Sequence, residues 1–329
     1  MRIVTFIAIA MVAAALYPPA AIAQSTPAKP AFALPTESVT VTSVKPSDET
    51  IRGFVERRAT PTPVVGKAAR WRHPICPLTV GLGDKYAKYV TQRIRDVAAA
   101  VGAPVDPDPA CKSNIEVVFT TTPQLFMDGV RKTGPAFLGY HSSNAQADEM
   151  AKVTHPIQAW YTTESLDFDG SAQVDSGQCA GSGTTLNYIE IGTVPGGGTF
   201  ITPITLNLSC ARIMHASGSR LGSGYDSGFK NVLIMAEPGK LFDYEVGSLA
   251  DYITMLALSQ PASLDSCQDL SSVSNLLAKG CASAAPKISD GDLAYLQGLY
   301  NAPDGYSLTG QRDAMEYQMK KTLVTDKNH

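Results

Sequence analysis

The sequence predicts an α+β protein with a mixed β-sheet, an N-terminal βαβ layer, an edge hairpin and a helical C-terminal part stapled by disulfides. Three observations carry this prediction. A strand–helix–strand pattern spans residues 77–120, the middle third alternates β-branched with polar residues, and helical periodicity dominates beyond residue 244. All six cysteines follow an apolar N-terminal segment of signal-peptide length.

The N-terminus has the pattern of an export signal. Arg2 precedes the apolar run Ile3–Leu16, and Ala21-Ile22-Ala23 forms a small-x-small cleavage pattern before Gln24. We therefore expect residues 1–23 to be removed and the mature protein to be periplasmic or secreted, where an even number of cysteines forms disulfides. No later apolar run approaches the roughly 18 residues of a membrane span, so no transmembrane segment is expected after cleavage.

Three further segments are expected after the signal. Residues 24–37 are rich in Pro, Ala and Ser and predict a flexible leader. Residues 38–64 predict a small β-α unit, with a strand at Val39–Val41 followed by a short helix after Pro46. The main α+β domain is expected to span residues 65–329.

The composition argues against one class of partner. The chain has 27 basic and 30 acidic residues, and loss of Arg2 with the signal (27 minus 1) leaves 26 basic residues. No segment concentrates Lys and Arg into the positive stripe that binds a phosphate backbone. We therefore expect no nucleic-acid partner.

The main domain begins with a strand–helix–strand unit. Pro77–Leu82 is a short apolar strand, residues 84–101 repeat apolar positions at helical spacing, and Asn114–Thr120 alternates as a second strand. A crossover of this length implies parallel strands and a right-handed connection. Cys76 and Cys111 then lie at the same end of the sheet, so we expect them to form a disulfide.

The middle third is expected to be mainly strand. Ile157–Leu166 predicts one strand, and residues 185–208 predict an antiparallel hairpin around a run of three glycines. Because β-branched residues rather than a helix follow the glycines, this run predicts a hairpin turn and not a phosphate-binding loop. Cys179 and Cys210 fall near the open base of the hairpin, and we expect them to pair.

The last third is predicted to be mainly helical. Asn231–Ala236 predicts a short buried strand, and residues 244–259 carry apolar positions at i, i+3, i+4 and i+7. Further helices are expected at Leu270–Ala278, after the capping pattern that begins at Ser289, and around Met315.

Cys267 and Cys281 flank the predicted helix 270–278, and short extended flanks would allow them to join. Three disulfides use every cysteine. No C-x-x-C pair is present, so neither thiol redox chemistry nor a zinc–thiolate site is expected.

The five histidines do not form a metal-binding pattern. None is spaced i, i+4 with another, so no helical histidine pair exists to bind a metal. His141, His155 and His215 lie in predicted loops and could converge in space. The favoured interpretation is that they are ordinary hydrogen-bonded or surface histidines, and no metal or cofactor is expected.

Asp251 is the candidate catalytic carboxylate. It stands between Ala250 and Tyr252 on a largely apolar predicted helix, where a carboxylate either bonds a buried partner or serves acid–base chemistry. No G-x-S-x-G nucleophile motif accompanies it. The structural interpretation is favoured over the functional one.

The layout resembles the zincin plan of metalloproteases, over about residues 70–322. The strand Val232–Met235 is followed by Val246–Tyr252, where the family places its H-E-x-x-H helix. The stretches Asp292–Tyr300 and Gln311–Met315 also resemble uncharacterised exported proteobacterial proteins of that plan. The resemblance implies a sheet layer followed by an edge hairpin, an edge strand and a long helix.

The chain departs from that family in its chemistry. No histidine lies between His215 and His329, so the helix at 244–259 cannot bind zinc in the family's way. The resemblance therefore implies an inactive, metal-free relative whose edge strand and cleft beside this helix bind a peptide or protein. We expect a non-catalytic binding or envelope-associated protein. The alternative is a peptidase-like hydrolase with a site near Asp251, His141, His155 and His215.

Overall fold

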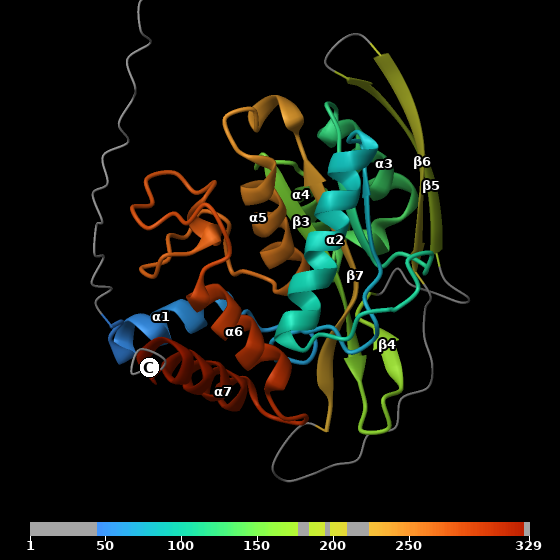
Figure 1. Ribbon diagram of the computed structural model, residues 1–329. Coiled ribbons are helices and arrows are strands. Elements are labelled where there is room, and N and C mark those ends of the chain that lie inside the picture. The colour runs from blue at the N-terminus through green and yellow to red at the C-terminus, as the bar shows by residue number, and fades with distance from the viewer. Residues whose placement is uncertain (1–44, 177–183, 195–197, 209–223, 326–329) are drawn as a thin grey trace, which may run out of the picture. The chain divides into compact units, whose positions relative to one another are not determined.

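The computed structural model describes residues 45–176, 184–194, 198–208 and 224–325 (Figure 1). Within these residues the chain has an α+β fold with a five-stranded mixed open sheet, a separate two-stranded hairpin and seven α-helices. The expected signal, the leader and the strand at Val39–Val41 lie outside the described residues. No helix in the described part is long and apolar enough to cross a membrane.

The elements have the following bounds. The α-helices are α1 (Asp48–Arg58), α2 (Asp84–Val101), α3 (Pro123–Thr133), α4 (Asn144–Met150), α5 (Val246–Leu258), α6 (Asp290–Asn301) and α7 (Leu308–Lys320). The strands are β1 (Pro77–Val80), β2 (Ile115–Phe119), β3 (Ile157–Leu166), β4 (Ala172–Val174), β5 (Thr184–Val194), β6 (Gly198–Leu208) and β7 (Asp226–Ala236). Short helical turns are η1 (Pro135–Leu138), η2 (Pro238–Lys240), η3 (Val273–Asn275) and η4 (Lys321–Thr325).

The main sheet has the strand order β1-β2-β7-β3-β4. β1, β2 and β7 are parallel, and β3 runs antiparallel to both β7 and β4. The predicted parallel strand–helix–strand unit is therefore confirmed, and the Cys76–Cys111 disulfide forms at its start. Cys179 and Cys210 lie outside the described residues.

The hairpin differs from the expectation in its position. β5 and β6 pair with each other over their whole length, but they form a sheet of their own and not an edge of the main sheet. Alternating polarity predicts a strand and its nearest partner, whereas the sheet that a hairpin joins is decided by contacts distant in sequence. Leu206 and Leu208 of β6 are buried in the core on one face of the main sheet.

Each face of the main sheet has its own hydrophobic core. On one face, Ile115 and Val117 of β2 join residues of α2 and α5. On the other face, Val118 of β2 joins residues of α3, η1 and α4. This alternation follows from the two-residue period of a strand, and it explains why β2 is buried throughout.

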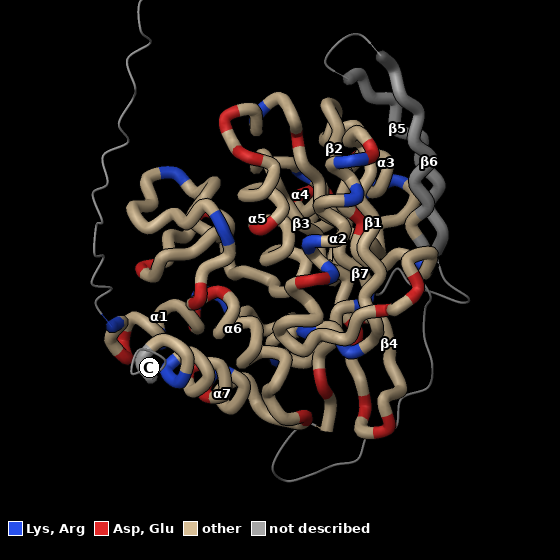
Figure 2. Tube along the Cα trace, in the orientation of Figure 1, with Lys and Arg blue, Asp and Glu red and all other residues tan. Residues whose placement is uncertain are grey.

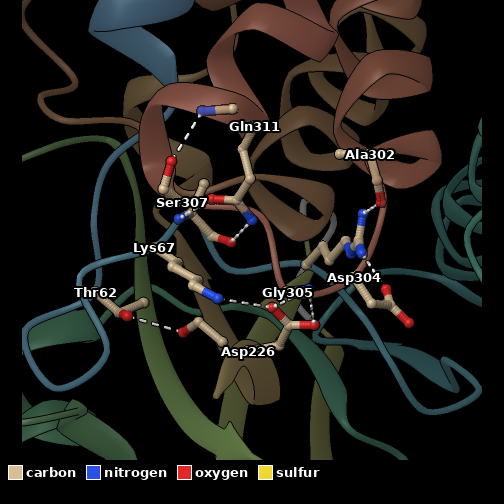
Figure 3. Close-up of polar contacts among 12 residues, drawn as sticks. Thr62, Lys67, Asp226, Ala302, Asp304, Gly305, Ser307 and Gln311 are labelled. Carbon is tan, nitrogen blue, oxygen red and sulfur yellow. Dashed lines mark hydrogen bonds and ion pairs between the residues drawn. The ribbon is translucent and has the colours of Figure 1, made fainter. Parts of the chain in front are cut away.

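The C-terminal helices are joined to the N-terminal part by buried polar contacts. The side-chain amide of Gln311 in α7 accepts from the N–H of Ala68 (2.9 Å) and donates to its carbonyl (3.2 Å). Asp226, at the start of β7, accepts from Lys67 Nζ (3.2 Å) and from the N–H of Gly305 (3.1 Å; Figure 3). These contacts tie the segment before β1 to both the sheet and α7.

The predicted helix at 270–278 is wrong. Between α5 and α6 the described chain has only the turn η3, and side chains satisfy much of the backbone. The amide of Asn275 accepts from the N–H of Gln268 (2.7 Å) and donates to its carbonyl (2.9 Å), which holds a loop in place of a helix. The predicted Cys267–Cys281 disulfide nevertheless forms across this loop.

Candidate functional site

β3 has an open edge over much of its length. β4 pairs only with Glu164–Leu166, and the N–H of Asp175 continues the contact to the carbonyl of Thr163 (2.8 Å). Residues 157–162 pair with β7 on one side, and no other strand in the described chain pairs with them on the other. An edge of this kind presents backbone groups to which another extended chain can bond.

The register indicates which backbone groups face the open edge. Val232 of β7 donates its N–H to the backbone just before β2 (2.9 Å), so its peptide groups point away from β3. The direction of the peptide N–H and C=O groups alternates from one residue to the next along a strand. These groups of Leu233 therefore point to β3, where Trp160 is its register partner. Ala159 and Tyr161, the neighbours of Trp160, then direct their N–H and C=O groups away from β7. Gly139 packs against the carbonyl oxygen of Tyr161, so the groups of Ala159 are the ones left at the open edge.

A groove of about 370 Å³ runs along this edge. Its floor includes Gln158–Tyr161 of β3, and one wall is the segment Gln260–Leu264 that follows α5. Leu138 and Tyr140, on either side of Gly139, also line the groove. Gly139 has φ 91°, and a Cβ there would lie 2.4 Å from the carbonyl oxygen of Tyr161, so only glycine permits this close approach.

Charged residues are interspersed in sign along the described chain (Figure 2). The groove follows this pattern, because its charged lining residues include Glu149 and Lys152, which form an ion pair with each other. Aromatic and apolar side chains account for much of the remaining lining. The groove therefore suits an uncharged, extended ligand better than a strongly charged one.

Two groove residues, Thr154 and His155, belong to a hydroxyl–imidazole–carboxylate series. Thr154 Oγ1 lies 2.8 Å from His155 Nδ1, and His155 Nε2 lies 3.1 Å from Asp265 Oδ1. This order is the one used to activate a hydroxyl nucleophile. However, the backbone N–H groups of Thr154 and His155 both bond Gln158 Oε1 (2.8 and 3.3 Å), so neither is available to stabilise an oxyanion.

Asp251 lies elsewhere and has structural partners. It is 3% exposed, pairs with Nε of Arg93 in α2, and accepts from the N–H of Ile288 before α6 (2.8 Å). Its carboxylate thus joins α5 to two other elements. This placement agrees with the structural interpretation, because both oxygens of the carboxylate are engaged.

The predicted catalytic residues are not brought together in the described chain. His141 is buried and its Nδ1 lies 2.9 Å from the carbonyl oxygen of Gly139, whereas His155 contacts Thr154 and Asp265. None of the contacts of Asp251 reaches either histidine. His215 lies outside the described residues.

The space beside α5 is divided into two unequal parts. A pocket of about 10 Å³ lies directly against the helix, lined by Tyr252, Met255 and Leu256 among others. The larger groove begins just beyond the end of α5, at Gln260. The sequence does not locate this groove, because hydrophobic alternation at Ile157–Leu166 predicts a strand without saying which of its edges is free.

Comparison of the chain with protein-family models, characterised proteins and solved structures finds no match. The fold and the site therefore define the class. The residues that the structure describes form an α+β fold with a mixed open sheet and two disulfides, and a groove lies along the open edge of an antiparallel strand.

Proposed function

We propose that this is an exported, periplasmic or secreted, non-catalytic protein that binds an extended peptide segment of a partner along the open edge of β3. The observation that carries the proposal is that unpaired backbone groups of β3 coincide with a groove of about 370 Å³. In strand addition, main-chain hydrogen bonds provide affinity, and pockets for alternate side chains provide specificity.

The zincin-like plan supports a role without catalysis. α5 follows β7 as the metal-binding helix follows a strand in that family, but α5 contains no histidine. Its buried acidic residue, Asp251, is already paired with Arg93. A metal-free protein with this plan would retain the peptide-binding strand edge and would lose the peptidase activity.

Two features support export. The first 23 residues have the pattern of a cleaved signal. Two disulfides are present in the described chain, and disulfides persist mainly in oxidising compartments.

A backbone-modified peptide tests strand addition. A fluorescent peptide of alternating Thr and Val should bind, as measured by anisotropy, and the same peptide N-methylated at alternate residues should lose at least tenfold in affinity. N-methylation removes the donors that bond the strand edge but keeps the side chains. Equal binding of the two peptides, or no binding of either, would contradict the proposal.

A substitution at the open edge tests whether the peptide binds to β3. Ala159→Pro removes an N–H that faces the edge, a position where β3 tolerates proline because no strand bond is lost. We expect this variant to lose peptide binding and to keep its fold, as measured by circular dichroism. The matched control, Ala159→Ser, retains the N–H and should bind normally.

The hydrolase alternative rests on the series Thr154, His155 and Asp265. If it holds, the bound peptide will be cleaved, and His155→Asn will abolish cleavage while leaving peptide affinity unchanged. Under our proposal, mass spectrometry recovers the peptide intact after prolonged incubation with the unmodified protein.

A further inference from the structure

Arg58 is a buried guanidinium without an acidic partner among the described residues. It is the last residue of α1 and is 2% exposed. Nη1 donates to Ser274 Oγ (2.6 Å), Nη2 donates to Ser259 Oγ (2.9 Å), and the guanidinium carbon lies 5.8 Å from the ring centre of Tyr295. Its Nε is buried and has no hydrogen-bond partner.

Two carboxylates of the segment between α5 and α6, which also contains Ser274, are engaged by other residues. Asp269 pairs with the neighbouring Arg57 (2.6 Å), and Asp265 pairs with His155 (3.1 Å). Hydroxyl groups and an aromatic face only partly offset the cost of burying a positive charge. A buried charge is normally paired with an ion of opposite sign, so the partner of Arg58 has still to be identified.

A pocket of matching chemistry adjoins Arg58. It has a volume of about 10 Å³, and its polar lining includes Tyr252, Ser266, Gln268 and Ser274. Burial raises the pKa of Tyr252 to about 12, so its hydroxyl stays protonated at neutral pH. Hydroxyls, an amide and a guanidinium can all donate hydrogen bonds, and no carboxylate lines the pocket.

We propose that this pocket binds a small monovalent anion, of the size of chloride, as the counter-ion of Arg58. The pocket has room for only about one small ion or molecule, so it is too small for a phosphate or a larger organic acid. The surrounding donors and the positive charge favour an anion over a neutral water molecule. The proposal does not depend on peptide binding, because the pocket lies on the α5 side of the Pro261–Leu264 wall that it shares with the groove.

Thermal unfolding in two salts tests the anion. At constant ionic strength, replacing sodium methanesulfonate by sodium chloride should raise Tm by a few degrees, saturably, because chloride fits the pocket and binds only the folded state. Arg58→Gln should abolish this difference. The matched control Arg52→Gln, on the same helix, removes an exposed ion pair with Glu316 and should keep the difference.

Anomalous diffraction from crystals grown in bromide tests the location, even if Arg58→Gln does not fold. We expect a bromide peak in the pocket, in contact with Arg58. A water molecule alone in the pocket would overturn the proposal. So would an unfolding temperature that is the same in both salts, because a bromide peak would then reflect binding at crystal concentration only.

Discussion

Glu116 is a carboxyl group enclosed in the middle of the main sheet. It is 1% exposed, and its Oε2 accepts from Nδ2 of Asn231 (2.7 Å). The Oδ1 of Asn231 is a buried acceptor without a donor. Burial raises the pKa of Glu116 from 4.5 to about 7, although hydrogen bonds from Asn231, Ser113 and the backbone favour the charged form, and a proton on Glu116 would supply a donor for Oδ1 of Asn231.

This carboxyl group should make stability depend on pH. Because the folded state holds the proton more tightly than the unfolded state, the free energy of unfolding falls as pH rises from 4.5 toward about 7. The difference between these two pKa values corresponds to a change of about 3 kcal/mol in the free energy of unfolding. Urea unfolding at pH 5 and pH 8 should show this loss, and Glu116→Gln, which keeps a donor for Asn231, should reduce it. An equal loss in both proteins would rule out Glu116 as the source.

The contacts of Asp251 with Arg93 and Ile288 predict that its carboxylate contributes to stability and not to catalysis. Asp251→Asn removes the charge that pairs with Arg93 but keeps an acceptor for the N–H of Ile288. We expect a loss of about 2 kcal/mol in the free energy of unfolding, with unchanged peptide affinity. As a control, Asp148→Asn breaks a pair whose carboxylate is 61% exposed and should cost less than about 1 kcal/mol. A loss of ligand binding or activity without destabilisation would assign Asp251 to a functional site.

At the scale of elements, the spacing of apolar and capping residues predicted most of the helices and strands that local interactions determine. The strand–helix–strand unit, the strand at Ile157–Leu166 and the capping box at Ser289 all appear where the sequence indicates them. The helix at 270–278 fails because the side chain of Asn275, within the predicted helix, bonds the backbone of Gln268 before it and so holds a loop. The groove escapes prediction because β3 pairs on one side with β7, which is distant in sequence, and hydrophobic alternation does not indicate which edge of the strand this pairing leaves free.

The two described disulfides differ in accessibility, which allows one element to be released selectively. Cys76 is 4% exposed, whereas Cys267 is exposed in the irregular segment between α5 and α6. A dithiol reductant attacks an accessible sulfur faster, so mild reduction followed by alkylation should label Cys267 and Cys281 first. Mass spectrometry of the alkylated peptides measures the order.

Release of this disulfide should also loosen the adjacent wall of the groove. Residues 260–264 lie a few positions before Cys267, so limited proteolysis of the reduced protein should cut near this wall before it cuts the sheet. Simultaneous labelling of Cys76 and Cys111 would show that the two disulfides are equally protected.

At the scale of the whole molecule, α1 connects the start of the described chain to its end. Ile51 and Phe54 of α1 share a hydrophobic core with Met315 and Met319 of α7, and Figure 1 shows α1 beside α7. Phe54 is fully buried, with its ring edge-on to Tyr295 of α6 (5.8 Å between ring centres). The helical end of the chain thus closes on residues that lie more than 200 positions earlier.

This closure predicts that α1 and the C-terminal helices unfold together. Phe54→Ala should lower the free energy of unfolding by about 3–5 kcal/mol, because it leaves a cavity between α1 and α6. Hydrogen exchange should show protection falling in α1, α6 and α7 to the same extent, since packing on Phe54 supports all three. If only α1 lost protection, residues 38–64 would instead form the separate unit that their sequence suggests, docked on a main domain that folds without them.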